Sequence, residues 1–231
     1  MNPSAVRPAT RAMKAAQATQ GGRPQSPGEE LANAVSHGLA CLLSVAAWPV
    51  LVERAAQQGT SLDEAAAAVF AGTMVLLYAV SALYHALPSG LAKGWLNRLD
   101  HAAIYVFIAG SCTPFTVSAL HGGWGWTMFT LVWSLAALGV AVKLLNRLRH
   151  PVVSTGLYLI MGWSAVLAAA PAVAQMSGRG LAWLVAGGLC YTAGAVAFLL
   201  DQRVRYAHFV WHLFVVAGSA CHVLAALRHL Q

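Results

Sequence analysis

Seven apolar segments, each long enough to cross a lipid bilayer, limit what this chain can fold into. A helix needs about 20 residues to span the hydrocarbon core. The segments cover approximately residues 31–52, 65–87, 100–120, 123–145, 154–174, 180–200 and 207–228. Only 9% of the 231 residues are charged, against about 25% in soluble domains. We therefore expect an all-α polytopic membrane protein with a seven-transmembrane-helix bundle over residues 29–231. Six spans is the alternative, because the fifth and sixth segments are the least clearly separated.

Lys and Arg are shared unevenly between the two sets of connections. The N-terminal stretch and every second connection after it hold eleven of them, whereas the other connections and the C-terminus hold three. Because cytoplasmic loops are enriched in basic residues, we expect the N-terminus in the cytoplasm and the C-terminus outside. Residues 1–28 contain four Lys or Arg, no acidic residue and no long apolar core. We expect them to form a disordered basic cytoplasmic tail.

The same composition argues against two other classes of protein. The net charge is +7, but the basic residues do not form a stripe interleaved with aromatic residues, so we expect no nucleic-acid partner. The four cysteines lie in different apolar segments and none forms a CxxC pair, which predicts neither a disulfide framework nor a thiolate metal site.

Ionisable residues are rare in the apolar segments, and such residues are functional candidates by default. Ser81 and His85 lie near the end of the second segment, Asp100 opens the third, and His208 and His212 lie near the start of the seventh. With the expected orientation, all of these positions lie near the cytoplasmic side of the membrane. Three segments that are distant in sequence therefore converge on one leaflet.

The spacing of the histidines predicts a metal site. His208 and His212 are four residues apart, so both project from one face of a helix. Together with His85 they give three imidazoles and an open position, which is typical of catalytic Zn²⁺. Asp100 would either ligate the metal or accept a proton from the water that zinc activates. We predict His85, His208 and His212 as zinc ligands, and Asp100 and Ser81 as catalytic residues, with Ser81 as a supporting donor or a donor to an oxyanion.

Each of these residues also has an ordinary explanation when taken alone. Asp100 would serve as an N-cap of the third helix, and Ser81 would bond to a carbonyl of its own helix. A single histidine near the membrane interface, such as His85, is usually structural. His222 lies about 21 Å from His208 along a helix, too far to share a metal. His37 lies on the cytoplasmic half of the first segment, where a supporting role is open to it.

Five stretches of the chain resemble the haemolysin III family, the bacterial branch of the progestin and adipoQ receptor superfamily. They are EELANAVSHGLA, SALYHAL, LDHAAIYVFIAGSCTPF, STGLYLIMGW and HFVWHLFVVAGSACH. The resemblance implies a seven-helix bundle with a cytoplasmic N-terminus. The zinc motifs of the family, Ser-x₃-His, Asp and His-x₃-His, fall on the five residues singled out above. It also implies a bacterial inner-membrane location.

The resemblance and the residues leave three functions open. The haemolysin III family is in turn similar to the alkaline ceramidases, and this implies a zinc hydrolase that acts on an amide or ester bond, with membrane lipids as substrate. A sensor or regulator of membrane state, with a structural zinc, is the first alternative. A pore-forming cytolysin, the activity behind the family name, is the second, although no apolar segment carries a polar stripe along its length. Nothing in the sequence indicates an oligomeric state.

Overall fold

The chain folds into helices throughout the part that the structure describes. The computed structural model describes residues 23–119, 123–148, 150–167 and 176–229. Within these ranges there are seven α-helices, one short π-helix and no strand. The helices are α2 (Pro27–Gln58), α3 (Ser61–Ala86), α4 (Leu91–Pro114), the π-helix η1 (Phe115–Ala119), α5 (Gly123–Leu144), α6 (Pro151–Leu167), α8 (Gly178–Leu200) and α9 (Ala207–His229).

Local sequence signals set the starts of the first two helices. Ser26 caps α2 through a capping box with Glu29, and Pro27 occupies the first turn, where its missing N–H is not needed. Thr60 forms the equivalent capping box with Asp63 at the start of α3. Because only two residues separate α2 from α3, the two helices pack side by side as an antiparallel pair.

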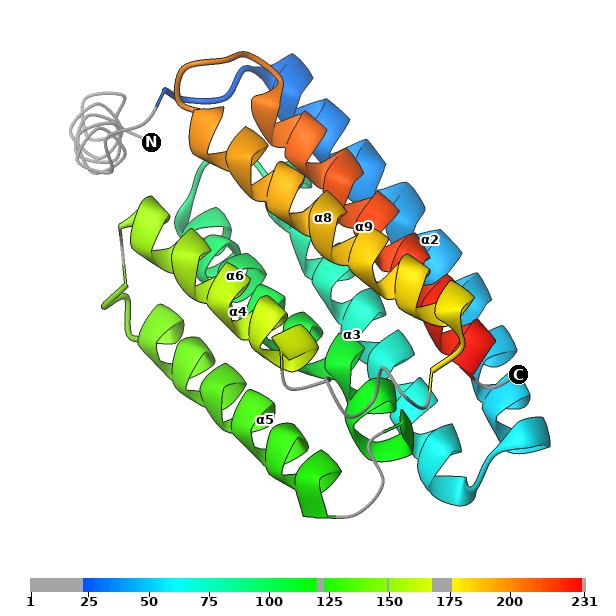
Figure 1. The fold of residues 1–231 in the computed structure, drawn as a ribbon. Helices are drawn as coiled ribbons and strands as arrows, with labels where there is room; N and C mark the ends of the chain where they lie inside the picture. Colours follow the sequence, from blue (N-terminus) through cyan, green and yellow to red (C-terminus); the bar gives the residue numbers. More distant parts are fainter. Residues whose placement is uncertain (1–22, 120–122, 149, 168–175, 230–231) are drawn as a thin grey trace, which may run out of the picture.

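Six helices enclose the interior of the bundle, and one lies outside it. Going round, α2 packs against α3, α3 against α4, α4 against α6, α6 against α8, α8 against α9, and α9 against α2 (Figure 1). Helix α5 packs mainly against the outer side of α4. The first and last helices are therefore neighbours, which brings the start of α9 next to the start of α2.

Close approach of α3 and α4 is possible because residues at their contact are small. A Cβ atom built on Gly110 of α4 would lie 2.0 Å from Thr73 Oγ1 of α3, far inside van der Waals contact. Larger buried side chains on both sides, among them Phe70, Tyr78 and Phe107, complete this part of the core. The contact holds the C-terminal half of α3, which carries Ser81 and His85, against α4.

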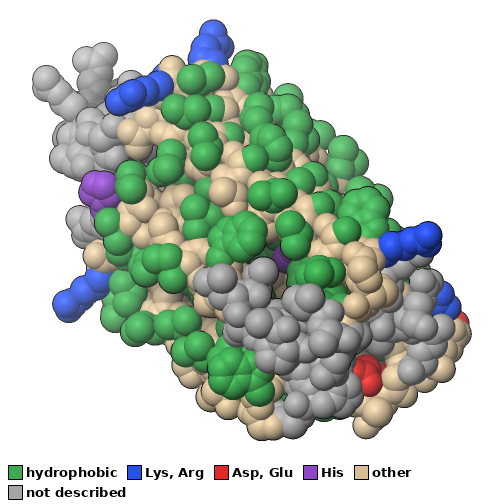
Figure 2. All heavy atoms as spheres, in the orientation of Figure 1, with side chains coloured by type: hydrophobic (Ala, Val, Ile, Leu, Met, Phe, Trp, Pro, Cys, Tyr) green, Lys and Arg blue, Asp and Glu red, His purple; other side chains and the backbone are tan. Residues whose placement is uncertain are grey.

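The outer surface is largely apolar. Hydrophobic side chains cover most of the face seen in Figure 2, and the Lys and Arg side chains lie towards its margins. Leu39, Leu42, Leu43, Val45 and Val50 of α2 are all exposed. Among the described residues, five helices are long and apolar enough to cross a membrane, namely α2, α3, α5, α8 and α9. The chain is a polytopic helical membrane protein.

Several helix limits differ from the predicted segments. Helix α4 begins at Leu91 rather than at residue 100, because the stretch from 91 to 99 continues the helix although it is only partly apolar. Helix α2 runs from Pro27 to Gln58, beyond the predicted segment 31–52 at both ends. Residues 1–22, predicted as the tail, and residues 168–175, predicted to end the fifth span, lie outside the described residues.

Candidate metal centre

Three histidines from two helices meet inside the bundle. His85 lies in the last turn of α3, and His208 and His212 lie in the first two turns of α9. One nitrogen from each ring can be chosen so that all three lie within 4.8 Å of one another. The three residues are 4%, 8% and 0% exposed, respectively. The structure therefore brings together the three predicted ligands in a buried group that can hold a metal ion.

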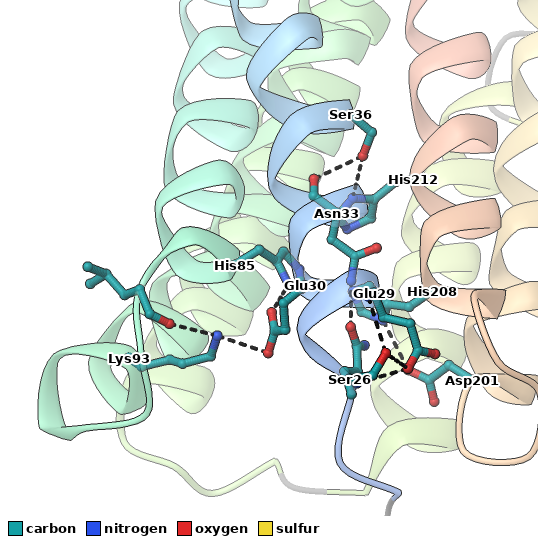
Figure 3. Close-up of polar contacts among 12 residues, drawn as sticks. Ser26, Glu29, Glu30, Asn33, Ser36, His85, Lys93, Asp201, His208 and His212 are labelled. Carbon is teal, nitrogen blue, oxygen red and sulfur yellow. Dashed lines mark hydrogen bonds and ion pairs between the residues drawn. The ribbon is translucent and has the colours of Figure 1, made fainter.

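Each ring is held in place by a partner at Nδ1 (Figure 3). His85 Nδ1 lies 2.7 Å from Glu30 Oε2, and His208 Nδ1 lies 3.0 Å from Asp201 Oδ2. His212 Nδ1 lies 3.1 Å from the hydroxyl oxygen of Ser36. Metal-binding histidines commonly have a partner of this kind at the other ring nitrogen, which fixes the ring orientation.

The partners also fix the tautomer of the rings. The hydroxyl of Ser36 donates its hydrogen to the carbonyl oxygen of Asn33 at 2.9 Å. Towards His212 Nδ1 it can therefore act only as a hydrogen-bond acceptor. Nδ1 must therefore carry the hydrogen and donate it, which leaves the lone pair of the neutral ring on Nε2. The Nδ1 atoms of His85 and His208 face carboxylates and donate in the same way. All three rings thus have a lone pair on Nε2.

The three Nε2 atoms are buried and have no hydrogen-bond partner within the described ranges. Three unpaired lone pairs facing one another inside a membrane protein are unfavourable on their own. A metal ion that accepts nitrogen ligands satisfies all three at once. The donor set therefore fits a metal centre with three protein ligands.

Asp100 and Ser81 lie beside this group but are not part of it. Asp100 is 2% exposed and Ser81 is 1% exposed, and the two side chains adjoin each other, with His208 nearby. The Asp100 carboxylate does not belong to the set of ligand atoms within 4.8 Å of one another. The arrangement leaves Asp100 next to the metal centre and facing the interior.

The ordinary explanations for Asp100 and Ser81 are wrong. Asp100 does not cap α4, because that helix begins at Leu91 after Gly90 and Asp100 lies well inside it. Ser81 Oγ makes no hydrogen bond to any group that the structure describes, so it does not bond to a carbonyl of its own helix. Both polar groups are therefore available to something else in the interior.

Sequence reasoning missed the partners of the histidines. Glu30 and Asp201 lie just outside the apolar segments 31–52 and 180–200, so neither is among the predicted site residues. Ser36 is not ionisable and is not among them either. The signal for Ser36 in the sequence is that it directly precedes His37. Both residues contact His212 of α9 in the structure. His37 is 2% exposed and its ring stacks on His212, with centroids 3.5 Å apart and an interplanar angle of 6°.

A second set of polar contacts fixes the position of α9 relative to α2. Glu29 Oε1 accepts a hydrogen bond from the backbone N–H of Tyr206 at 2.9 Å. Tyr206 precedes α9 and has a positive φ of 59°, a conformation that costs free energy and needs support from its surroundings. Arg23 Nη1 donates to Glu29 Oε2 at 2.9 Å, and this bond raises the pKa of Arg23.

A partly open cavity reaches the site from the interior of the bundle. Its walls are mostly apolar and aromatic side chains of α4, α6, α8 and α9, such as Phe107, Trp163 and Trp211. Asp100 and His37 line it as well. The cavity therefore connects the polar groups next to the metal centre with an apolar space suited to hydrocarbon.

The chain is similar to known proteins over most of its length. The chain matches the family model described as "Haemolysin-III related" over residues 26–223. It is 40% identical over 192 residues to the Hemolysin-3 homolog of Bacillus subtilis (strain 168), covering 83% of this chain and 90% of that protein. It is 39% identical over 192 residues to Hemolysin-3 of Bacillus cereus, covering 83% and 87%.

More distant similarity extends to animal proteins. The chain is 33% identical over 162 residues to the human monocyte to macrophage differentiation factor, covering 67% of this chain and 66% of that protein. It is 24% identical over 220 residues to the adiponectin receptor protein of Drosophila melanogaster, covering 84% and 49%. No solved structure matches the chain.

Proposed function

The chain belongs to the haemolysin-III-related family, and on this premise we propose that it is a zinc-dependent lipid hydrolase of the bacterial inner membrane. All seven helices would span the bilayer, with the N-terminus in the cytoplasm. The distribution of Lys and Arg, eleven against three, supports this orientation. The site then lies near the cytoplasmic leaflet, where it would act on an amide or ester bond of a membrane lipid.

The observation that carries the proposal is that one ring nitrogen from each of the three histidines lies within 4.8 Å of the other two, while all three Nε2 atoms are buried and unpartnered in the described structure. His85, His208 and His212 would hold zinc, a metal that suits neutral imidazole and commonly has three protein ligands in catalytic sites. When bound, zinc would supply Lewis acidity to a carbonyl and lower the pKa of water towards about 7. Asp201, Glu30 and Ser36 would keep the three rings in the orientation that binding requires.

The remaining polar groups have roles that fit hydrolysis. Asp100 would accept the proton of the attacking water, because a buried carboxylate outside the ligand set is placed for proton transfer. Ser81, whose hydroxyl is unpartnered in the described structure, would donate a hydrogen bond to the developing oxyanion. The apolar cavity beside Asp100 would take the hydrocarbon chain of the lipid and exclude water from it.

Two alternatives are supported less well by the same geometry. A structural zinc in a sensor of membrane state usually has four protein ligands, and the buried group here contains three. A pore-forming cytolysin needs a polar path along the bundle. The polar groups of the site instead gather at one end of the bundle, where α2 and α9 begin.

The proposed activity can be tested by comparing lipids in cells that express the wild type or the His212→Ala variant. Mass spectrometry of whole lipid extracts should show one class of amide- or ester-linked lipid depleted by the wild type, with its fatty acid product increased. The variant should leave that class unchanged. Identical lipid profiles at matched membrane levels of both proteins would contradict the hydrolase and favour the sensor.

Replacing Glu30 with glutamine should weaken zinc binding without abolishing it. The carboxylate holds His85 at Nδ1 and is itself paired with Lys93, whose Nζ lies 2.9 Å from Glu30 Oε1. Loss of such a partner typically lowers metal affinity by about 10- to 100-fold. Competition with a chelator of known affinity measures the change. Glu53→Gln, at an exposed position elsewhere on α2, serves as the control and should bind zinc like the wild type.

A further inference from the structure

A cluster of four hydroxyl groups lies between α4 and α6, away from the three histidines. It consists of Tyr105 of α4 and Ser154, Thr155 and Tyr158 of α6, and is called the hydroxyl cluster below. The rings of Tyr105 and Tyr158 contact each other with centroids 4.6 Å apart. Thr155 and Tyr158 line the same cavity as Asp100, and Tyr105 follows Asp100 by about 7.5 Å along α4.

Three members of the hydroxyl cluster have no hydrogen-bond partner although they are buried. Tyr105, Ser154 and Thr155 are 3%, 2% and 4% exposed, and none of their oxygen atoms bonds to another described group. The two tyrosine hydroxyls approach Ser154 without reaching ordinary hydrogen-bond geometry. Only Tyr158 is partnered, by donating to the carbonyl oxygen of His101 at 3.0 Å.

Other hydroxyls in the same region behave differently. Ser111 also lines the cavity, but it donates to the carbonyl oxygen of Ile108 at 3.0 Å. Thr113 donates to the carbonyl oxygen of Ala109 at 2.8 Å. Serine and threonine in apolar helices usually satisfy themselves in this way. The unpartnered hydroxyls of the cluster are therefore a local feature, and buried polar groups of this kind need an explanation.

The chemistry of the cluster points to an uncharged ligand. None of its four side chains carries a charge, and each hydroxyl both donates and accepts. No Lys or Arg is among the described residues that line the cavity, and Lys143 of α5 donates to the carbonyl oxygen of Leu148 at 3.2 Å. A phosphate or carboxylate would therefore find no opposite charge here, whereas alcohol groups would find matching donors and acceptors.

We propose that the hydroxyl cluster binds the alcohol groups of an uncharged, single-chain lipid, such as a monoacylglycerol, whose hydrocarbon chain lies in the cavity. The inference rests on the proposed function in one respect, that a lipid enters this cavity. It adds the class of headgroup that the site selects. It also gives a partner to the unpartnered hydroxyl of Thr155, which lines the cavity.

A pair of ether lipids tests this proposal without any turnover, because neither contains an amide or ester bond. The purified wild type should bind 1-O-oleylglycerol about 10- to 100-fold more tightly than oleyl methyl ether, since two or three hydrogen bonds separate the two probes. Ligand-dependent shifts of the melting temperature measure both affinities. The triple variant Tyr105→Phe, Ser154→Ala, Thr155→Val should bind the two probes equally.

The Ser111→Ala variant is the matched control, because it removes a cavity hydroxyl that is already satisfied, and it should keep the wild-type preference. Without ligand, the triple variant should melt no lower than the wild type, since it loses unsatisfied polar groups. If the triple variant fails to fold, Tyr105→Phe alone should reduce the preference. The proposal is overturned if the wild type shows no preference for the glyceryl ether, or if the triple variant retains the wild-type preference. If the wild type prefers the glyceryl ether but the lipid profiles of cells expressing wild type and His212→Ala are identical, the hydrolase is refuted and the headgroup subsite is retained.

Discussion

The His212→Ala variant is expected to purify with almost no zinc, whereas the wild type should carry about one ion per chain. His212 is fully buried, and its Nε2 is one of only two nitrogens that α9 offers to the site. Without it only His85 and His208 remain, fewer than the three or four protein ligands that zinc sites use. Inductively coupled plasma mass spectrometry on protein purified in detergent measures the ratio directly.

A matched variant separates this effect from unspecific metal binding by histidines. His150 is exposed and lies in the connection before α6, so His150→Ala should retain the wild-type zinc content. Zinc that stays at one ion per chain in His212→Ala would mean that the metal, if any, is held elsewhere. A wild-type protein that contains a different metal in stoichiometric amount would keep the site but overturn the assignment of zinc.

The Asp100→Asn variant should lose lipid turnover while keeping its metal. Asparagine has nearly the same shape but cannot accept a proton, so general-base catalysis, worth about 10²- to 10⁴-fold, should disappear. The carboxylate is not among the clustered ligand atoms, so zinc content should stay at the wild-type level. Turnover of the lipid class identified in cells, measured on purified protein together with zinc content, checks both halves of the prediction.

A second carboxylate provides the contrast for this experiment. Asp201 lies 3.0 Å from His208 Nδ1, so Asp201→Asn should lower zinc affinity and turnover together, and added zinc should restore part of the activity. Added zinc should not restore Asp100→Asn. If Asp100→Asn loses zinc as well, the carboxylate is a ligand, and the structural role of the metal gains support.

Much of the site was predictable because its ligands follow rules of spacing. His208 and His212 share a helix face because they are four residues apart, and the charge distribution placed His85 at the same depth. These arguments need no side-chain detail. The predictions that the three histidines would meet and that the chain is a helical membrane protein are confirmed. The role of Asp100 as a base stays a prediction.

The partners of the histidines were not predictable by the same route. Glu30 is separated from His85 by 55 residues in sequence, and its contact depends on how α2 and α3 pack against each other. Nothing in the periodicity of either helix sets that rotation. The start of α4 was also missed, because hydropathy locates the apolar part of a helix and not its first turn. Backbone hydrogen bonding continues past the apolar limit to Leu91, where the helix begins after Gly90.

The packing of α9 between α2 and α8 has a consequence for the biogenesis of the protein. Two of the three histidines lie on α9, the last described helix along the chain, and the third lies on α3, the second described helix. A nascent chain that has not yet inserted α9 contains only His85 of the three. A metal held by this group would therefore be captured only after α9 has packed, and its binding would report that α3 and α9 have come together.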